Sequence, residues 1–239
     1  MESLPLFLLS MDVIWPNATV PLTVFEPRYR VMIARALASR WEDDLRFGVV
    51  DHRLLEGLDQ GEGTRATGWD RVFGVEAFIL EQTLVMHEDG KSSFQARGDR
   101  VLRIHTLWEE SVLEHPAASI TSLRFGAESL YHANVTFVTD TVDDRKAAQE
   151  ARKRIVKVLR GTFKLGLDEL SSWLADELCS TKAPQSCEYS SSELSLMLSA
   201  RLPLKLEEKQ SLFRMRSPAK RLNYISHMLE TGTGLAGMS

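Results

Sequence analysis

The chain has 239 residues, of which 44% are hydrophobic and 26% are charged. This composition is that of a folded globular protein, and it excludes intrinsic disorder for most of the chain. The formal net charge of -4 argues against a dedicated nucleic-acid binder, because such proteins are usually strongly basic. The two cysteines, Cys179 and Cys187, are too few for a disulfide scaffold or a four-cysteine zinc site.

The N-terminus carries a short apolar run over residues 4–9, which contains Pro5 and follows the acidic Glu2. A secretory signal needs basic residues before a longer apolar stretch, so we do not expect one here. No stretch of the chain approaches the roughly 18 apolar residues of a membrane span. The sequence therefore predicts a cytoplasmic or otherwise intracellular protein with no membrane partner.

The first elements are expected to be extended, with a turn at Trp15-Pro16-Asn17-Ala18 and a strand over 20–25. Pro21 should place this strand at an edge of its sheet or at a strand start. Pro27 then suits the first position of a helix, which we predict over 27–39 from the helical spacing of its apolar residues. These apolar residues are Tyr29, Met32, Ile33, Ala36 and Leu37, whereas Arg28, Arg30, Arg35 and Arg40 fall largely on the other face.

Short strands dominate the chain from residue 45 to residue 138. The Asp89-Gly90 pair predicts a hairpin turn within 85–94, and Gly98-Asp99-Arg100 predicts a second turn. Together with one helix, six to eight short strands favour an α+β fold built on a small barrel or sandwich. The expected strands cover 45–50, 71–84, 101–108, 119–124 and 130–138, with a glycine-rich loop over 56–70.

The composition changes after Asp140, and the remaining residues have helical periodicity. Residues 145–160 contain seven basic residues and one acidic residue, which predicts a helix with a basic face. Ser217-Pro218 supplies an N-cap followed by a proline in the first turn of a last helix. Further helices are predicted over 168–179, 190–201 and 205–215. We therefore expect two domains, 1–140 and 141–239, the second a helical bundle with a disordered tail over 231–239.

None of the catalytic motifs that we considered is complete. Gly90-Lys91-Ser92 resembles the end of a phosphate-binding loop, but Val85 stands where that loop needs a glycine. Ser217 and Lys220 have the Ser-x-x-Lys spacing of serine acyltransferases, but the companion Lys-Thr-Gly is absent and a helix cap explains the serine. The six histidines are scattered, and no two have the i, i+4 spacing of metal ligands on one helix face. The sequence predicts no catalytic residue, no cofactor and no metal site.

The most distinctive phrase is Pro21-Leu22-Thr23-Val24-Phe25-Glu26-Pro27-Arg28-Tyr29-Arg30. It resembles the signature of the Lon protease N-terminal domain, also called the Lon substrate-binding domain. The resemblance covers most of residues 3–230. It includes Leu4-Pro5-Leu6-Phe7, Phe47-Gly48-Val49-Val50, Gly74-Val75-Glu76-Ala77, Gly98-Asp99-Arg100 and Leu202-Pro203-Leu204.

This resemblance implies a PUA-like pseudo-β-barrel with one inserted helix, followed by a C-terminal helical bundle. Full Lon proteases continue into an ATPase and a Ser-Lys peptidase, and this sequence ends before either could begin. The chain therefore looks like a stand-alone, non-catalytic member. Family members recognise other polypeptides, as the substrate-sensing part of a protease or as adaptors in ubiquitin ligases. The resemblance thus implies unfolded or partner polypeptides as ligands and an adaptor role in protein quality control or degradation.

The signature phrase also has a structural interpretation. Glu26 precedes Pro27 and is biased toward extended backbone, so the strand should end there and the helix should start at once. We expect Phe25 to pack beneath the helix and Tyr29 to face the barrel. Glu26 lies at the positive end of the helix dipole, where Arg28 or Arg30 can pair with it.

Three tryptophans in or next to predicted turns complete the candidate site, because large rings anchor many interfaces. The candidate peptide-binding residues are Trp15, Glu26, Arg28, Tyr29, Trp41 and Trp69. Two alternatives stay open. One is an RNA-binding PUA-like protein, supported by the basic helix over 145–160 and opposed by the acidic net charge. The other is an unrecognised enzyme, which needs a pocket of convergent side chains with shifted pKa values.

Overall fold

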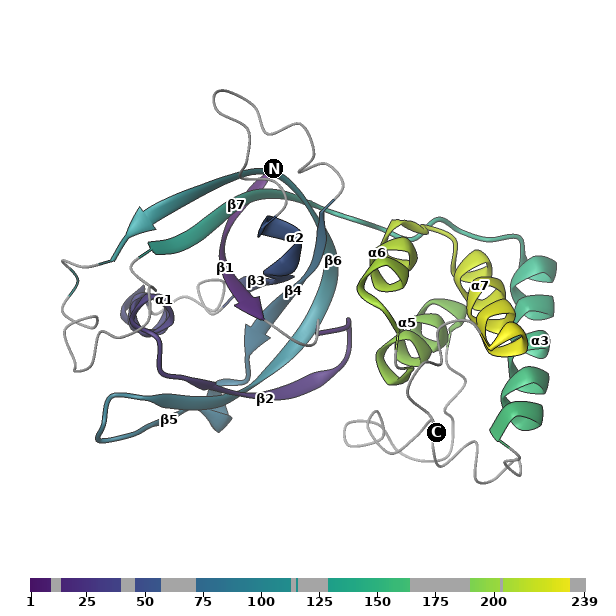
Figure 1. Cartoon of the computed structure of the whole chain (residues 1–239), viewed down its shortest axis with the longest axis horizontal. Coiled ribbons are helices and arrows are strands. Elements are labelled where there is room, and N and C mark those ends of the chain that lie inside the picture. Colours follow the sequence, from purple (N-terminus) through teal and green to yellow (C-terminus); the bar gives the residue numbers. More distant parts are fainter. Residues whose placement is uncertain are drawn as a thin grey trace. The chain divides into compact units, whose positions relative to one another are not determined.

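The computed structural model describes residues 1–9, 14–39, 46–56, 72–112, 115, 129–163, 190–202 and 204–232. The chain divides into two compact units, Met1–Val138 and Thr139–Ser239. Figure 1 shows a curved sheet in the first unit and helices in the second. The expected strand over 119–124 and the expected helix over 168–179 lie outside the described residues.

Five strands of the first unit form a ring. Around this ring, β1 pairs with β3 in parallel, and the pairs β3–β4, β4–β6, β6–β7 and β7–β1 are antiparallel. The ring closes because the long β6 pairs with β4 through residues 96–103 and with β7 through residues 102–111. The ring strands are β1 (Glu2–Leu9), β3 (Arg46–Asp51), β4 (Phe73–Ile79), β6 (Ser92–Ser111) and β7 (Ser129–Phe137). This barrel-like sheet confirms the α+β class expected from the sequence.

Two hydrophobic clusters lie on opposite faces of this sheet, as the alternation of side chains along a strand requires. Leu6 belongs to one cluster, with Leu102 and Val135, and its neighbour Phe7 belongs to the other. The second cluster also includes Tyr29 and further residues of α1 (Pro27–Ser39), which therefore packs on that face. The remaining elements of the unit are β2 (Thr19–Val24), β5 (Val85–Met86), α2 (Arg53–Glu56) and the 3-10 turn η3 (Glu81–Thr83).

The predicted helix over 27–39 is confirmed by α1, although its faces differ from the expectation. Tyr29, Met32, Ile33 and Ala36 are buried, but Leu37 is 41% exposed. Arg30, which we expected on the outer face, is buried. Residues 29–33 are all buried, so the first half of α1 is covered on more sides than the single apolar stripe that the spacing predicts.

The turn predicted at Gly98-Asp99-Arg100 is wrong, because β6 runs through these residues without a break. Gly98 instead permits a close crossing of two backbone segments. Its N–H donates to the Ala18 carbonyl and its carbonyl accepts from the Asn17 N–H, each at 2.9 Å. A Cβ at this position would lie 2.2 Å from the Trp15 carbonyl oxygen, so a glycine is needed here. The Asp89-Gly90 turn is confirmed, with Gly90 at a φ of 76° between β5 and β6.

The second unit contains four helices among its described residues: α3 (Arg145–Phe163), α5 (Ser191–Arg201), α6 (Leu206–Arg214) and α7 (Pro218–Thr231). The start signals expected from the sequence are confirmed. The Ser190 side chain caps α5 by accepting from the Glu193 N–H, and Ser217 caps α7 with Pro218 in its first turn. Gly232 then ends α7 in the left-handed conformation.

A buried arginine ties parts of the helical unit together. The guanidinium of Arg221 in α7 donates to both carboxylate oxygens of Asp140, at 2.7 and 2.5 Å. It also donates to the Met215 carbonyl at 2.7 Å and to the Ser195 hydroxyl of α5 at 2.9 Å. Only 3% of its side chain is exposed, so these bonds compensate a charge that would otherwise be costly to bury.

Candidate functional site

The junction between β2 and α1 brings three predicted site residues together. The Glu26 carbonyl accepts hydrogen bonds from the N–H groups of Tyr29 and Arg30, each at 3.1 Å, and so closes the first turn of α1. The Glu26 carboxylate accepts from Arg28 Nε at 2.9 Å, which confirms the expected ion pair with one of the two arginines. The Arg28 guanidinium also lies 4.6 Å from the centroid of the Tyr29 ring.

Tyr29 connects this junction to β1. Its ring is 2% exposed and stacks on Phe7 with 4.0 Å between centroids. Its hydroxyl accepts from the Leu8 N–H at 2.9 Å and donates to the Leu8 carbonyl at 3.3 Å. Burial raises the pKa of the Tyr29 phenol to about 12. These contacts make Tyr29 a structural residue that fixes where α1 begins, and they leave Glu26 and Arg28 as its partly exposed neighbours.

The three tryptophans do not join this group. Trp15 is 3% exposed, so its ring offers no apolar surface to a partner. The crossing at Gly98 also holds the backbone of Trp15 against β6. Trp41 and Trp69 lie outside the described residues.

An apolar surface that sequence reasoning missed lies beside the junction. Phe25 is 60% exposed, Val85 is 53% exposed and Met86 is 57% exposed. The expectation that Phe25 packs beneath the helix is wrong, because Val24 fills the buried position and the next side chain points outward. We call these three residues the Phe25 surface.

The sheet register places the members of the Phe25 surface close together. Val24 of β2 and Met86 of β5 both pair with Ser92, from opposite sides of β6. Adjacent strands lie about 4.8 Å apart, so the backbones of residues 24 and 86 are separated by about 10 Å. Phe25 follows Val24 directly, and Val85 precedes Met86. Successive residues of a strand point to opposite faces, so Phe25 and Val85 share one face and Met86, in line with Val24, lies on the other. Exposed apolar side chains at one end of a sheet are typical of surfaces that bind other molecules.

Polar groups border the Phe25 surface. The hydroxyls of Thr23 and Ser93 are 3.2 Å apart, and His87 Nε2 lies 2.9 Å from the same Ser93 hydroxyl. At the tip of the hairpin, Lys91 and Asp89 form an ion pair of 2.6 Å. A polar rim around an apolar centre is the usual arrangement of a protein interface.

The outer edge of β2 adjoins this surface. Among the described strands β2 pairs only with β6, so no other described strand pairs with the backbone groups of its second edge. Pro21 lies in this strand and has no N–H to donate, which limits how regularly a further strand can pair there. The open edge therefore supplies a few hydrogen-bonding groups rather than a full ladder.

Residues 3–231 match the family model of the ATP-dependent protease La (LON) substrate-binding domain. The chain belongs to this family. It is similar to the Lon N-terminal domain protein from Xanthomonas campestris, with 20% identity over 94% of this chain and 97% of that one, and a TM-score of 0.52. It is also similar to the N-terminal domain of Mycobacterium avium complex Lon protease, with 15% identity over 96% and 98% of the two chains and a TM-score of 0.56. No curated protein matches the chain.

Within this LON substrate-binding domain, another polar group links α1 to the barrel. Arg35 donates to both carboxylate oxygens of Glu110, at 2.8 and 2.6 Å, and His132 Nε2 lies 2.9 Å from Glu110 Oε2. Hydrogen bonding from Arg35 lowers the pKa of Glu110 to about 2. The Trp108 ring stacks on His132 with 5.5 Å between centroids. Sequence periodicity gives no sign of this group, because its members come from three separate elements.

The described residues of the domain contain no group of three or more His, Cys, Asp or Glu side chains placed to hold a metal ion. In the same part of the chain, no helix is long and apolar enough to cross a membrane.

Proposed function

We propose that this LON substrate-binding domain is a non-catalytic module that binds unfolded or partner polypeptides through the Phe25 surface. The observation that carries the proposal is the exposure of Phe25, Val85 and Met86 at one end of the sheet, within a family named for substrate binding. In the cell, such binding suits an adaptor in protein quality control or degradation.

The chemistry of the Phe25 surface fits an apolar segment of polypeptide. An aromatic ring and a methionine offer a large contact area, and methionine adapts its shape to different partners. Burial of three such side chains against a partner contributes free energy of binding at about 25 cal/mol per Å² of apolar area removed from water. Backbone groups at the open edge of β2 can add hydrogen bonds that do not depend on the sequence of the partner.

The contacts of Ser217 support a non-catalytic role. Its hydroxyl donates to Asp143 Oδ1 at 2.5 Å and accepts from the Lys220 backbone N–H at 3.2 Å. A serine nucleophile needs its hydroxyl directed to a substrate with a base beside it. Here the hydroxyl caps α7 instead, as the sequence predicts, and the Ser-x-x-Lys spacing has a structural explanation.

Fluorescence anisotropy with a labelled, permanently unfolded polypeptide tests the proposal on the full chain. The double variant Phe25→Ser/Val85→Ser removes the two exposed apolar side chains that share a face, and it should bind at least about tenfold more weakly, because central apolar anchors dominate binding energy. Val142→Ser is the matched control, since Val142 is 99% exposed and lies in the other unit. The control should bind as the wild type does. Equal affinity in the double variant and the wild type contradicts the proposal.

A further inference from the structure

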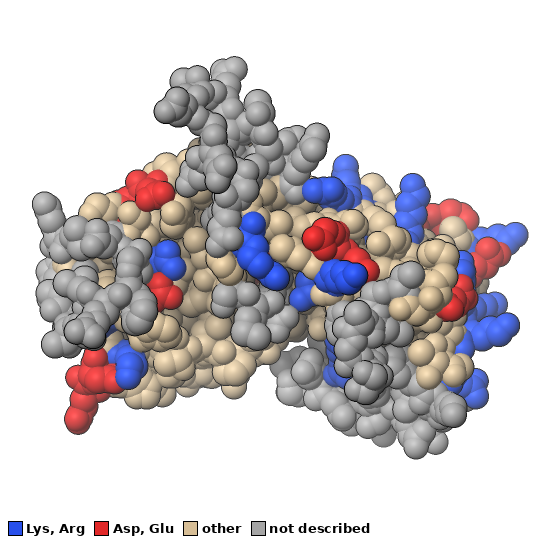
Figure 2. All heavy atoms as spheres, in the orientation of Figure 1, with Lys and Arg blue, Asp and Glu red and all other residues tan. Residues whose placement is uncertain are grey.

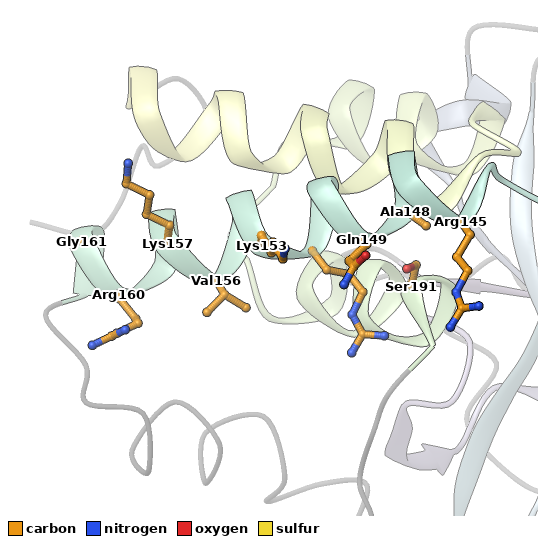
Figure 3. A pocket seen from close by; sticks show the side chains of 10 residues that line it. Arg145, Ala148, Gln149, Lys153, Val156, Lys157, Arg160, Gly161 and Ser191 are labelled. Atoms are coloured by element: carbon orange, nitrogen blue, oxygen red, sulfur yellow. The ribbon is translucent and has the colours of Figure 1, made fainter.

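The second unit contains a groove with a strongly positive lining. It has a volume of about 1060 Å³ and lies along α3, with Ser191 at the start of α5 on its border. Figure 3 shows Arg145, Val156 and Arg160 leaving α3 on the same side. Five cationic residues line the groove: Arg145, Arg152, Lys153, Lys157 and Arg160. Among the described lining residues there is no carboxylate.

The periodicity of α3 explains why the three arginines share one side of the helix. Residues 145, 149, 152, 156 and 160 follow each other at intervals of three or four, which places them along one face. The buried face is formed by Ala151, Ile155 and Leu159, and α3 packs against α7. The basic face is therefore set by the sequence of the helix and does not depend on a particular side-chain rotamer.

The arginines of the groove differ from Arg154 of the same helix in their ion pairs. Arg154, on another face, is paired with Glu230 of α7 at 2.6 Å. By contrast, no carboxylate of the described residues lies within ion-pair distance of Arg145, Arg152 or Arg160. A row of arginines without a carboxylate partner among the described residues attracts anions, and the planar guanidinium binds carboxylates through two parallel hydrogen bonds.

The charge of the chain is unevenly divided between its two units. Residues 139–239 contain 16 Lys and Arg and 13 Asp and Glu. Residues 1–138 contain 13 Lys and Arg and 20 Asp and Glu. Figure 2 shows that most of the Lys and Arg side chains visible from this direction lie over the helical unit. The helical unit therefore has an excess of three positive charges, which is far from the strong basicity of nucleic-acid-binding domains.

The remaining lining favours a polypeptide over a nucleic acid. Ala148 and Val156 lie between the arginines, and no aromatic residue is among the described lining residues. Single-stranded nucleic acids usually bind where bases can stack on aromatic rings, and this groove offers none. Small aliphatic side chains between cations suit a peptide that alternates acidic and apolar residues.

The spacing of the arginines along α3 fits an extended peptide. Arg145, Arg152 and Arg160 are spaced by about 10 and 12 Å along the helix, at 1.5 Å per residue. An extended peptide rises about 3.3 Å per residue, so carboxylates three or four residues apart match this spacing. We propose that the groove along α3 binds an acidic segment of a polypeptide, whose carboxylates pair with Arg145, Arg152 and Arg160. This site is separate from the Phe25 surface and goes beyond the proposed function.

Anisotropy with the full chain and three labelled probes of equal length tests this proposal. The probes are a peptide with glutamate at every third or fourth position, the same peptide with glutamine instead, and a single-stranded RNA. The glutamate peptide should bind at least about tenfold more tightly than the glutamine peptide, with an affinity that falls as salt rises. Tighter binding of the RNA than of the glutamate peptide would overturn the proposal, and so would no binding of the glutamate peptide.

Two double variants with the same change in charge locate the site. Arg152→Glu/Arg160→Glu reverses the groove, whereas Lys146→Glu/Lys220→Glu reverses two exposed lysines that do not line it. The groove variant should lose at least about tenfold in affinity for the glutamate peptide, and the control less than about twofold. Equal losses would show attraction to overall charge and contradict the proposal. Phe25→Ser/Val85→Ser should keep full affinity for the glutamate peptide, which separates a failure here from a failure of the proposed function.

Discussion

The Tyr29 hydroxyl both accepts a hydrogen bond from the Leu8 N–H and donates one to the Leu8 carbonyl. This pair of bonds fixes the first turn of α1 to β1, where the ring also stacks on Phe7. Because Phe25 lies four residues before Tyr29, the same contacts determine where the exposed ring of Phe25 is held. A buried tyrosine thus positions an exposed phenylalanine.

Tyr29→Phe should lower the free energy of unfolding by about 1 kcal/mol, because it leaves the partly buried Leu8 N–H without its acceptor. Urea denaturation measures this loss. A variant as stable as the wild type would show that the two hydrogen bonds contribute nothing net.

The titration of Tyr29 gives a second test of the same contact. Its folded pKa of about 12 lies above the ordinary value of 10.0, so the folded state keeps the proton longer than the unfolded state does. The stabilising contribution is therefore complete below pH 10 and is lost as the pH rises toward 12. Ultraviolet titration of the folded chain should show one of its four tyrosines ionising last, and Tyr29→Phe should remove that step.

Two glycine substitutions should change stability in opposite directions. Gly98→Ala places a Cβ 2.2 Å from the Trp15 carbonyl oxygen and should destabilise the chain by about 2 kcal/mol or more. Gly161→Ala, in α3, meets no atom within 4 Å and should stabilise it by about 0.5–1 kcal/mol through helix propensity. Thermal unfolding of the two variants measures whether stability falls in the first and rises in the second. A Gly98→Ala variant as stable as the wild type would contradict the close crossing of the two backbone segments.

The Arg35–Glu110 pair predicts a pH dependence. The pKa of Glu110 falls from 4.5 to about 2 on folding, so its ionised form stabilises the folded state above pH 4.5. Both side chains are about 40% exposed, which limits the contribution to about 0.5 kcal/mol. Glu110→Gln should show this loss at pH 7, and the difference from the wild type should shrink as the pH falls from 4.5 toward 2. A difference independent of pH would point to packing instead of charge.

Arg221→Leu should destabilise the helical unit by about 3 kcal/mol, because it leaves Asp140 and the Ser195 hydroxyl without their shared partner. Arg154→Ala removes only an exposed ion pair and serves as the control. Urea unfolding followed by circular dichroism of the helices compares the two variants. Similar urea midpoints for the two variants would contradict the prediction that Arg221 stabilises the helical unit more than the exposed ion pair does.

Local signals in the sequence were sufficient for the helix starts and for the hairpin. Pro27, Ser190 and Ser217 act through neighbouring backbone groups, so the sequence shows their effect directly. The role of Gly98 could not be found in this way, because it depends on a crossing by residues 15–18 that only the folded chain reveals. For the same reason, the sequence alone does not distinguish a glycine that forms a turn from one that allows two backbone segments to approach closely.

The candidate site was partly predictable. The pairing of Glu26 with Arg28 follows from their proximity at a helix start, and the burial of Tyr29 follows from the helical stripe. The exposure of Phe25 was missed because an apolar residue in a signature phrase suggests a buried position. Its true environment depends on Val24 occupying the last inward place of β2.

Amide hydrogen exchange of the full chain, with and without a saturating unfolded polypeptide, tests the Phe25 surface most directly. Binding should slow exchange over residues 19–25 and 85–92, because a bound segment covers the open edge of β2 and the hairpin beside it. Exchange in α7 should not change. Protection that appears elsewhere and spares both of these segments would contradict polypeptide binding at the Phe25 surface.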